Sequence, residues 1–404
     1  MSSPNQLSLI KYQNPVTRTY LGSPSILRLD DGSLLATHDY FGPGSPRNLE
    51  GEEHLTSVYR SRDDGRTWTN VTHIAGAFWS NLFKHRGAIY LLGASAQYGS
   101  IVIRRSEDGG KTWTHPRDER TGLIAAGGPY HDAPNYHCAP MPVLLRDGRL
   151  YRAFEDLDPC VWPTGFRTLV ISAPEDADLL AAASWTFSNR LAFDPAWLPQ
   201  EWRRVVDRPG WLEGNLVGAP NGEIWNILRF NSWPLVDKAA IVQVSDDGRH
   251  CSFDPTAGFI DLPGGMSKFT IRRDPVTGVY LTISNNNTNP AYPSQRNVLS
   301  LHMSEDLRHW RHVTTLLEDD SGLPPEQSMA QVGFQYVDWQ LDGEEILYVV
   351  RAAYRGAHDF HDANHLAFSR IKVFRRLCLS SGLSPAPAAL RPPAPIPCDP
   401  PGRS

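Results

Sequence analysis

The sequence predicts an all-β protein, built as a six-bladed β-propeller of four-stranded antiparallel blades, and three observations support this prediction. The 404 residues include 12 tryptophans, 32 glycines and 33 prolines, a composition typical of short strands joined by turns. A hairpin recurs six times along the chain. A third strand and a serine-led turn follow each copy. Tandem units of this kind indicate the blades of a propeller.

Each predicted hairpin consists of two apolar runs separated by a turn that contains glycine. Asp-Gly and Asn-Gly accept the positive φ that a tight turn requires, so they indicate a hairpin when apolar runs flank them. The clearest copies start at Ser25, Val143 and Gly218. The six turn glycines are Gly32, Gly87, Gly148, Gly222, Gly278 and Gly343.

A serine-led turn closes each unit. Two of these turns have the complete pattern Ser-x-Asp-x-Gly-x-x-Trp, over residues 61–68 and 106–113. In this pattern, an Asp box, the aspartate can accept bonds from turn amides, and the tryptophan packs between sheets. We therefore assign both turns a structural role. Incomplete copies begin at Ser172, Ser245, Ser304 and Ser369.

The sixth unit lacks an outer strand, because a segment rich in Pro, Ala and Ser soon follows its third strand. We expect residues 7–12 to supply that strand and close the ring, which hides the edges of the sheets. Seven blades remain an alternative, because residues 189–208 do not fit the repeat. In either case residues 1–376 form one propeller domain, and residues 377–404 form a disordered tail.

Charge and composition narrow the classes of partner. The chain has 39 basic and 44 acidic residues, and this balance gives no reason to expect a nucleic acid or a membrane as a partner. No stretch approaches the roughly 20 apolar residues of a membrane span, and the N-terminus lacks a leader pattern. We expect a cytoplasmic protein as the sequence is written, and a secreted one if the N-terminus is truncated. The five scattered cysteines favour reduced thiols.

One rim of the central channel is predicted to carry the functional residues. First strands start, second strands end and third strands start at the same rim, because consecutive strands of a blade are antiparallel. The polar residues on first strands are Tyr136, His137, Glu213, Asn215, Lys268, Gln335 and Tyr336. Those on second and third strands are Asp39, Glu155, Arg229, Arg351, Arg167 and Arg296, and His361 lies in a loop at the same rim.

Arg229 and Arg351 are the strongest candidates for contact with a ligand. Each ends an apolar second strand, so we expect each to point inward. A guanidinium group is a planar fork suited to a carboxylate, and several at one mouth predict an anionic oligosaccharide or polysaccharide as the partner. Histidine and aspartate at this rim offer ligands for a divalent cation, but their spacing matches no familiar zinc pattern. We therefore expect no cofactor.

The Asp boxes and the six hairpins resemble those of the sialidase superfamily over nearly the whole chain. Sialidases have Arg-Ile-Pro in the first strand, where the arginine holds the substrate carboxylate. This sequence has Gly22-Ser23-Pro24 there, so the first arginine of the sialidase triad is missing. Within the superfamily, the sequence resembles the polysaccharide lyases of the L-rhamnose-α-1,4-D-glucuronate lyase type. The segments that carry this resemblance are 137–143, 149–155, 211–215, 333–336, Arg351 and 361–364.

This second resemblance implies an exo-acting lyase that cleaves a glycosidic bond to a uronic acid by β-elimination. Such an enzyme removes the proton beside the carboxylate, which cationic side chains must neutralise, and expels the glycosidic oxygen. The clamp is assigned to Arg229, Arg351, Arg296 and Lys268. Base and acid are assigned to His137 with Tyr136 or Tyr336. Further substrate contacts are assigned to Glu213, Asn215, Gln335, Arg167 and His361.

Two alternatives remain open. A sialidase-like exo-glycoside hydrolase would use Tyr336 or Tyr354 as its nucleophile, assisted by Glu213 or Glu155. A non-catalytic glycan-binding propeller would bind a sugar without changing it. The product distinguishes the two enzymes, because elimination leaves an unsaturated uronate that absorbs ultraviolet light and hydrolysis does not.

Overall fold

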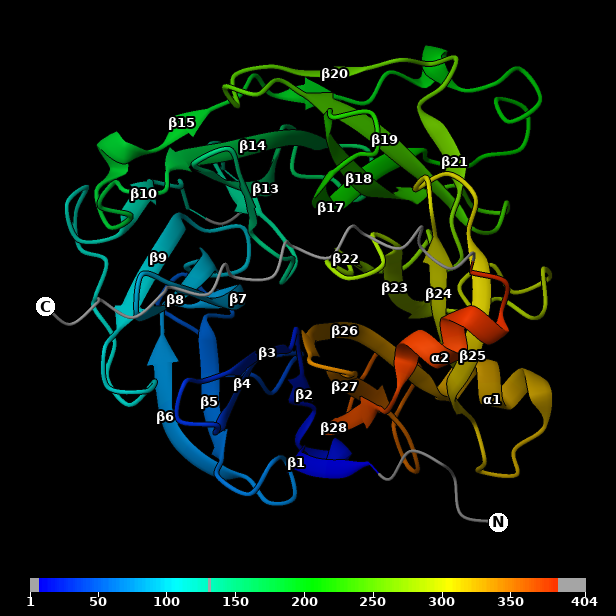
Figure 1. Cartoon of the computed structure of the whole chain (residues 1–404), viewed down its shortest axis with the longest axis horizontal. Coiled ribbons are helices and arrows are strands. Elements are labelled where there is room, and N and C mark those ends of the chain that lie inside the picture. Colours follow the sequence, from blue (N-terminus) through cyan, green and yellow to red (C-terminus); the bar gives the residue numbers. More distant parts are fainter. Residues whose placement is uncertain (1–6, 130–131, 384–404) are drawn as a thin grey trace, which may run out of the picture.

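The computed structural model describes residues 7–129 and 132–383 and confirms the six-bladed propeller. Six antiparallel sheets surround a central channel, and the chain passes from each blade to the next in sequence order (Figure 1). In the described residues, two short α-helices accompany the strands, α1 (Pro325–Gln331) and α2 (Phe374–Ser380). Neither is long and apolar enough to cross a membrane.

The first strand of each blade lies nearest the channel (Figure 1). Blade 1 contains η1 (Pro15–Thr17), β2 (Tyr20–Leu21), β3 (Ser25–Arg28), β4 (Leu34–Phe41), β5 (Leu55–Ser61) and β6 (Thr69–Ala75). Blade 2 contains β7 (Phe78–His85), β8 (Ala88–Ala94), β9 (Ile101–Ser106) and β10 (Leu123–Ala125). Blade 3 contains β11 (Tyr136–His137), β12 (Leu144–Arg146), β13 (Arg149–Leu157), β14 (Phe166–Pro174), η2 (Ala182–Ser184), β15 (Thr186–Phe187), β16 (Leu191–Ala192) and η3 (Pro195–Trp197).

The remaining three blades follow the same plan. Blade 4 contains β17 (Gly210–Gly218), β18 (Ile224–Asn231), β19 (Lys238–Val244), β20 (Cys251–Phe253) and β21 (Phe259–Asp261). Blade 5 contains β22 (Thr270–Arg273), β23 (Tyr280–Asn285), β24 (Val298–Ser304) and β25 (Arg311–Glu318). Blade 6 contains β26 (Gly333–Asp342), β27 (Glu345–Ala353), β28 (His365–Ile371) and the N-terminal strand β1 (Ser8–Tyr12).

The turns between first and second strands have the conformation that their sequences predict. All six predicted turn glycines have positive φ, between 63° and 89°. Both complete Asp boxes are closed by the tryptophan, since Trp68 Nε1 and Trp113 Nε1 donate to glycine carbonyls at 3.2 and 3.0 Å. The turn at Ser304 closes in the same way through Trp310 and the carbonyl of Leu307 at 3.2 Å. This copy is one residue shorter, and Leu307 takes the positive φ there.

The ring closes between the first and last parts of the chain. β1 pairs with β28, with Ser8 opposite Phe368 and Tyr12 opposite His365, and Ile10 is buried against blades 1 and 6. Residues 189–208 form no seventh blade. β16 in this segment pairs with β14, and Trp197 packs against Trp211 in the core between blades 3 and 4.

The predicted domain boundary at residue 376 falls within α2. Phe374, Cys378 and Leu383 are buried in the core formed by blades 5 and 6, and Arg375 donates to both carboxylate oxygens of Asp274. The folded domain therefore continues to at least residue 383. The rest of the predicted tail, residues 384–404, lies outside the described residues.

Candidate functional site

A cavity of about 410 Å³ lies at the end of the channel where first strands begin and second strands end. The strands and loops of all six blades contribute side chains to it. Seven of the predicted site residues line this cavity, namely His137, Glu213, Arg229, Arg296, Tyr336, Arg351 and His361. The fold therefore brings the two strongest arginine candidates and His137 to a single mouth.

A β-bulge in the first strand turns one side chain into the cavity in blades 2, 4 and 6. The register with the second strand shifts within residues 78–81, 212–215 and 335–338. Trp79, Glu213 and Tyr336 occupy these bulges with φ of 47°, 57° and 54°, in the left-handed region. Residues other than glycine adopt this region at a cost of about 1–3 kcal/mol, and such residues cluster at functional sites. All three line the cavity.

Tyr336 and Glu213 are joined by a short hydrogen bond. The Tyr336 hydroxyl donates to Glu213 Oε1 at 2.5 Å. Arg229 Nη1 donates to Glu213 Oε2 at 3.0 Å and lies 3.4 Å from the Tyr336 oxygen. The Met266 carbonyl accepts from Arg229 Nε at 2.8 Å and fixes the guanidinium group. The hydrogen bond between Tyr336 and Glu213 therefore connects blade 6 to blade 4, which are not neighbours in the ring.

Burial and charge set the protonation of this pair. Burial raises the pKa of Tyr336, and the Glu213 carboxylate raises it further, so the phenol is protonated at neutral pH. Burial alone would raise the pKa of Glu213 as well. The charge of Arg229, the electrostatic influence of His137 and the bond from Tyr336 instead hold the pKa of Glu213 below its ordinary value. A neutral phenol bonded to an ionised carboxylate is a nucleophile with its base already in place.

Arg351 and Arg296 carry N–H groups without a hydrogen-bond partner among the described residues. The Arg351 guanidinium lies 4.1 Å from the ring centre of Tyr336 and 5.0 Å from that of Phe41, and its Nε and Nη2 are unpaired. Arg296 binds the Gln335 side chain through Nη1, while its Nε is unpaired. Burial lowers the pKa of Arg296 to about 10, which still leaves it charged at neutral pH. Buried donors of this kind are suited to an anionic ligand.

Asp39 lines the cavity too, although the sequence placed it on the rim without singling it out. Its Oδ1 accepts from the Ser23 amide and its Oδ2 from the Trp79 amide, each at 2.7 Å. Burial raises the pKa of Asp39 to about 7. The two amides and the charge of Arg351 act in the opposite direction, but burial outweighs them. Gly22 allows the close approach, because a Cβ there would lie 1.6 Å from Oδ1. Asp39 can therefore hold a proton near neutral pH.

His137 faces the cavity among aromatic rings and is fixed by Glu155. Its Nδ1 lies 2.9 Å from Glu155 Oε2, and Glu155 Oε1 accepts from the Gly214 amide at 3.1 Å. The ring centres of Trp79 and Phe166 lie 4.3 and 4.9 Å from that of the imidazole. Glu155 thus connects His137 to the bulge that carries Glu213.

Two predicted residues lie away from the cavity because other partners hold them. Tyr136 is buried in the core between blades 2 and 3. Arg167 forms ion pairs with Asp156 and Asp158, with its Nε 2.8 Å from Asp156 Oδ1. Strand position predicted that both residues lie at the rim, but neither lines the cavity.

Three further predicted residues support the cavity without lining it. Lys268 is buried and donates to Thr270 Oγ1 and the Val337 carbonyl, each at 2.5 Å, and burial lowers its pKa to about 7. Asn215 accepts from the Ile271 amide at 2.9 Å. Gln335 holds Arg296 and donates to a carbonyl of the loop that carries His361. Burial lowers the pKa of His361 itself to about 4.

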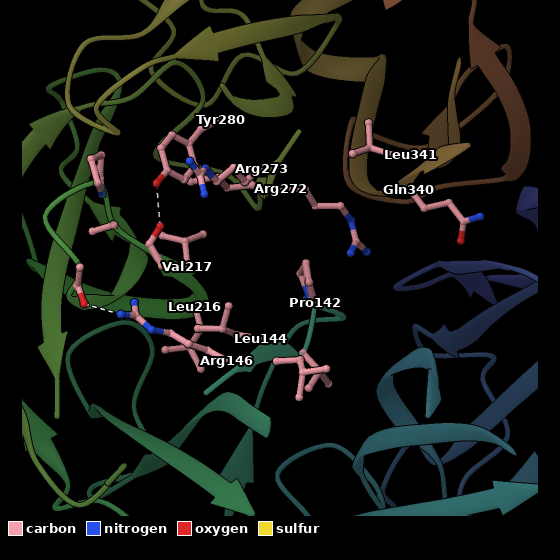
Figure 2. A pocket seen from close by; sticks show the side chains of 17 residues that line it. Pro142, Leu144, Arg146, Leu216, Val217, Arg272, Arg273, Tyr280, Gln340 and Leu341 are labelled. Carbon is pink, nitrogen blue, oxygen red and sulfur yellow. Dashed lines mark hydrogen bonds between the residues drawn. The ribbon is translucent and has the colours of Figure 1, made fainter. Parts of the chain in front are cut away.

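A second cavity, of about 720 Å³, lies at the opposite end of the channel beside the hairpin turns. Figure 2 shows its mixed lining, in which Leu144, Leu216 and Val217 lie with Arg272 and Arg273. Arg146 and Tyr280 do not offer their polar groups to this space, because they donate to the carbonyls of Gly222 and Gly218 (Figure 2). None of the predicted site residues is among the described residues that line it, so the first cavity is the candidate site.

Within the described part of the chain, neither a metal-binding cluster nor a reactive cysteine thiol provides a further candidate site. Among residues 7–129 and 132–383, no three His, Cys, Asp or Glu side chains lie close enough together to hold a metal ion. The four described cysteines are unpaired, and burial raises the pKa of Cys138 to about 12. Cys398 lies outside the described residues.

No family model matches the sequence, and no curated protein matches it at a significant level. Solved structures do match the fold. An α-L-arabinanase of Penicillium chrysogenum, in complex with arabinobiose, is 17% identical with a TM-score of 0.57, over 92% of this chain and 99% of its own. The GH93 α-L-arabinofuranosidase of Fusarium graminearum is 13% identical with a TM-score of 0.56, over 92% and 98%.

A sialidase provides a third similar structure. The enzyme of Trypanosoma rangeli, in complex with sialic acid, is 15% identical with a TM-score of 0.57, over 94% of this chain and 60% of its own. At these identities the likeness shows the fold alone, a β-propeller. None of these three proteins is a lyase, so the lyase prediction gains no support from them.

Proposed function

We propose that the protein is a retaining exo-glycoside hydrolase that releases a terminal sugar acid from a glycan. The hydrogen bond of 2.5 Å between Tyr336 and Glu213 carries this proposal. Retaining glycosidases form a covalent glycosyl-enzyme intermediate, and a tyrosine serves as the nucleophile in sialidases. The similar structures named above are an arabinanase, an arabinofuranosidase and a sialidase, which supports glycoside hydrolysis as the reaction class.

The reaction proceeds in two steps. First, the Tyr336 oxygen bonds to the anomeric carbon and its proton passes to Glu213. The bond from that carbon to the glycosidic oxygen breaks, and Asp39 gives its proton to the leaving oxygen. Second, a water attacks the anomeric carbon and gives one proton to Asp39, while Tyr336 leaves and recovers its proton from Glu213. Every group then returns to its starting state.

A neutral nucleophile suits an anionic sugar. A carboxylate nucleophile would be repelled by the carboxylate of the substrate, whereas the Tyr336 phenol is neutral until Glu213 takes its proton. The unpaired donors of Arg351 and Arg296 provide the charge and the geometry for that carboxylate. The segment that replaces the first sialidase arginine instead holds Asp39 through Ser23, and Arg351 supplies a third guanidinium from β27.

The lyase mechanism fits the cavity less well. Tyr136, one of the two tyrosines assigned with His137 to its base and acid, does not reach the cavity. Lys268 is engaged by Thr270 and Val337 and is not available to the clamp.

Tyr354, the other candidate nucleophile for hydrolysis, bonds to Asp320 instead of a lining carboxylate. Hydrolysis through Tyr336 is therefore our preferred reaction.

Fluorogenic glycosides test the proposal. We expect release of 4-methylumbelliferone from its glycoside of N-acetylneuraminic acid or D-glucuronic acid, and none from its L-arabinofuranoside. Tyr336→Phe should lower kcat by roughly 10³-fold or more, because it removes the nucleophile and retains the ring. A fluorinated sugar acid with a good leaving group should label Tyr336, as read by mass spectrometry of the digested protein.

The other outcomes are equally informative. Release only from the arabinofuranoside would remove the sugar acid from the proposal. An unsaturated uronate product, detected by ultraviolet absorbance with natural glycans, would establish elimination instead of hydrolysis. Saturable glycan binding without any product would identify a binding propeller.

A further inference from the structure

The cavity has an aromatic part as well as a cationic one. Trp79, Tyr98 and His137 line it and contact one another, with ring centres 5.6 Å apart for Trp79 and Tyr98 and 4.3 Å apart for Trp79 and His137. Trp162 lines the same cavity from the loop between β13 and β14. Its residue surface is 44% exposed, so Trp162 lies where the cavity meets solvent.

Exposure of a tryptophan is unusual in this chain. All twelve tryptophans lie within the described residues, and Trp162 and Trp233 are the two that are exposed. Because Trp162 also lines the cavity, its exposed indole can offer a face to a ligand bound there. Trp233 is 49% exposed but does not line the cavity, so it provides a matched control.

The loop that carries Trp162 is held in place by its backbone. The Arg208 guanidinium donates to the Trp162 carbonyl, and the Gly165 amide donates to the Val161 carbonyl at 2.8 Å. Gly210 packs against this loop, since a Cβ on it would lie 2.3 Å from the Pro163 carbonyl oxygen. The indole is therefore presented from a supported position, and little ordering of the loop is needed when a ligand binds.

We propose that Trp162 forms a binding subsite for a neutral sugar ring in the leaving-group part of the substrate, beyond the sugar acid held by the arginines. This inference rests on the proposed function. The face of a sugar ring that carries C–H groups packs well on an indole, which is flat, apolar and rigid. The indoles of Trp162 and Trp79 carry no charge, so we expect the sugar bound beside them to be neutral. The protein should accordingly prefer the ends of oligosaccharides to simple glycosides.

Binding to an inactive variant tests this subsite without requiring turnover. In the Tyr336→Phe protein, dissociation constants are measured by calorimetry for the methyl glycosides of N-acetylneuraminic acid and glucuronic acid, and for trisaccharides that end in these sugars. We expect the trisaccharide to bind more tightly than the methyl glycoside. Adding Trp162→Ala should weaken trisaccharide binding by roughly tenfold, while adding Trp233→Ala should leave it unchanged.

The same substitution can also be tested by kinetics, through the ratio of kcat/KM values for two substrates. In the otherwise native protein, Trp162→Ala should lower kcat/KM for the trisaccharide relative to kcat/KM for the aryl glycoside by a similar factor. Circular dichroism of each variant confirms that the fold is retained.

Each other result separates the two proposals. Trisaccharide binding that is unaffected by Trp162→Ala, or reduced equally by Trp233→Ala, would overturn the subsite and leave the proposed hydrolase standing. Binding of no glycan in the set by the Tyr336→Phe protein or the native protein would overturn the proposed function, and the subsite with it.

Discussion

At the scale of single residues, the chemistry of the cavity depends most on the environment of Asp39. Asp39 is 2% exposed and accepts hydrogen bonds from two backbone amides. These bonds favour the ionised form, but burial outweighs them and raises the pKa to about 7. A general acid acts only while protonated, so we expect kcat/KM to fall as pH rises through about 7. Asp39→Asn cannot titrate, so this fall should disappear. Its kcat/KM at lower pH should be reduced by roughly 10²–10⁴.

A pH–rate profile of both proteins checks the assignment, and the leaving group provides the control. A glycoside with a good leaving group needs little protonation, so Asp39→Asn should reduce its turnover much less than that of a natural glycan. A fall in kcat/KM above pH 7 that persists in Asp39→Asn would assign this titration to another group and remove Asp39 from the role of acid.

Single residues were predictable where strand position alone decides their direction. Arg229 and Arg351 end apolar second strands, and both line the cavity as this position predicts. The depth of a side chain and the charges around it could not be predicted in this way. Lys268 lies two residues before β22 and is buried without lining the cavity, and Arg167 forms ion pairs with two aspartates. These outcomes depend on contacts between segments that are distant in sequence, and strand position does not specify them.

At the scale of elements, the break between β2 and β3 controls how Asp39 is held. Gly22 lies in this break, and a Cβ added there would meet Asp39 Oδ1 at 1.6 Å. We expect Gly22→Ala to displace the carboxyl and to lower kcat/KM by roughly 10²-fold, the range expected when a general acid is lost. Gly218→Ala is the control, because its Cβ would meet only the end of the Arg146 side chain, at 3.3 Å.

Kinetics and thermal unfolding of the two alanine variants separate catalysis from stability. Gly22→Ala should lose activity at temperatures where its circular dichroism is still native, and Gly218→Ala should retain activity. Full activity in Gly22→Ala would mean that Asp39 can move without consequence, which contradicts its assigned role.

Some elements were less predictable than others. The bulges in β7, β17 and β26 carry Trp79, Glu213 and Tyr336, three different side chains with no shared sequence signal. Only the register between the folded strands reveals them. The helix α2 did have a signal, since Phe374, Leu377 and Cys378 have helical spacing and the first and last are buried. The Pro-rich composition that follows obscured it.

At the scale of the whole molecule, closure of the ring depends on β1. Ile10 is 7% exposed and packs in the core shared by blades 1 and 6, whereas its neighbour Leu9 is 53% exposed. Ile10→Asp would bury a charge without a partner, and we expect it to lower the free energy of unfolding by about 3 kcal/mol or more. Leu9→Asp should change it by no more than about 0.5 kcal/mol.

Urea unfolding of the two variants, followed by tryptophan fluorescence, measures this difference. Equal stabilities for Ile10→Asp and Leu9→Asp would mean that the N-terminal strand does not hold the ring closed. A large loss for Leu9→Asp would show instead that any charge in β1 disrupts its pairing with β28.

The architecture of the whole molecule was the most predictable level. Six glycine turns and two complete Asp boxes repeat often enough that an error in one copy does not change the count, and each turn glycine has the expected positive φ. Closure by residues 7–12 followed from the same repeat, because the sixth unit lacked one strand. The candidate site carries no such redundancy, since each of its residues occurs once.

One consequence follows from the placement of Tyr336 on blade 6 and Glu213 on blade 4. A chain emerging from the ribosome acquires the acid, the carboxylate and Arg229 long before it acquires the phenol that must meet them. Under the proposed mechanism, premature termination or proteolytic loss of the last blade leaves a protein that is chemically silent. Activity of the native sequence therefore requires that the sixth blade has been made and retained.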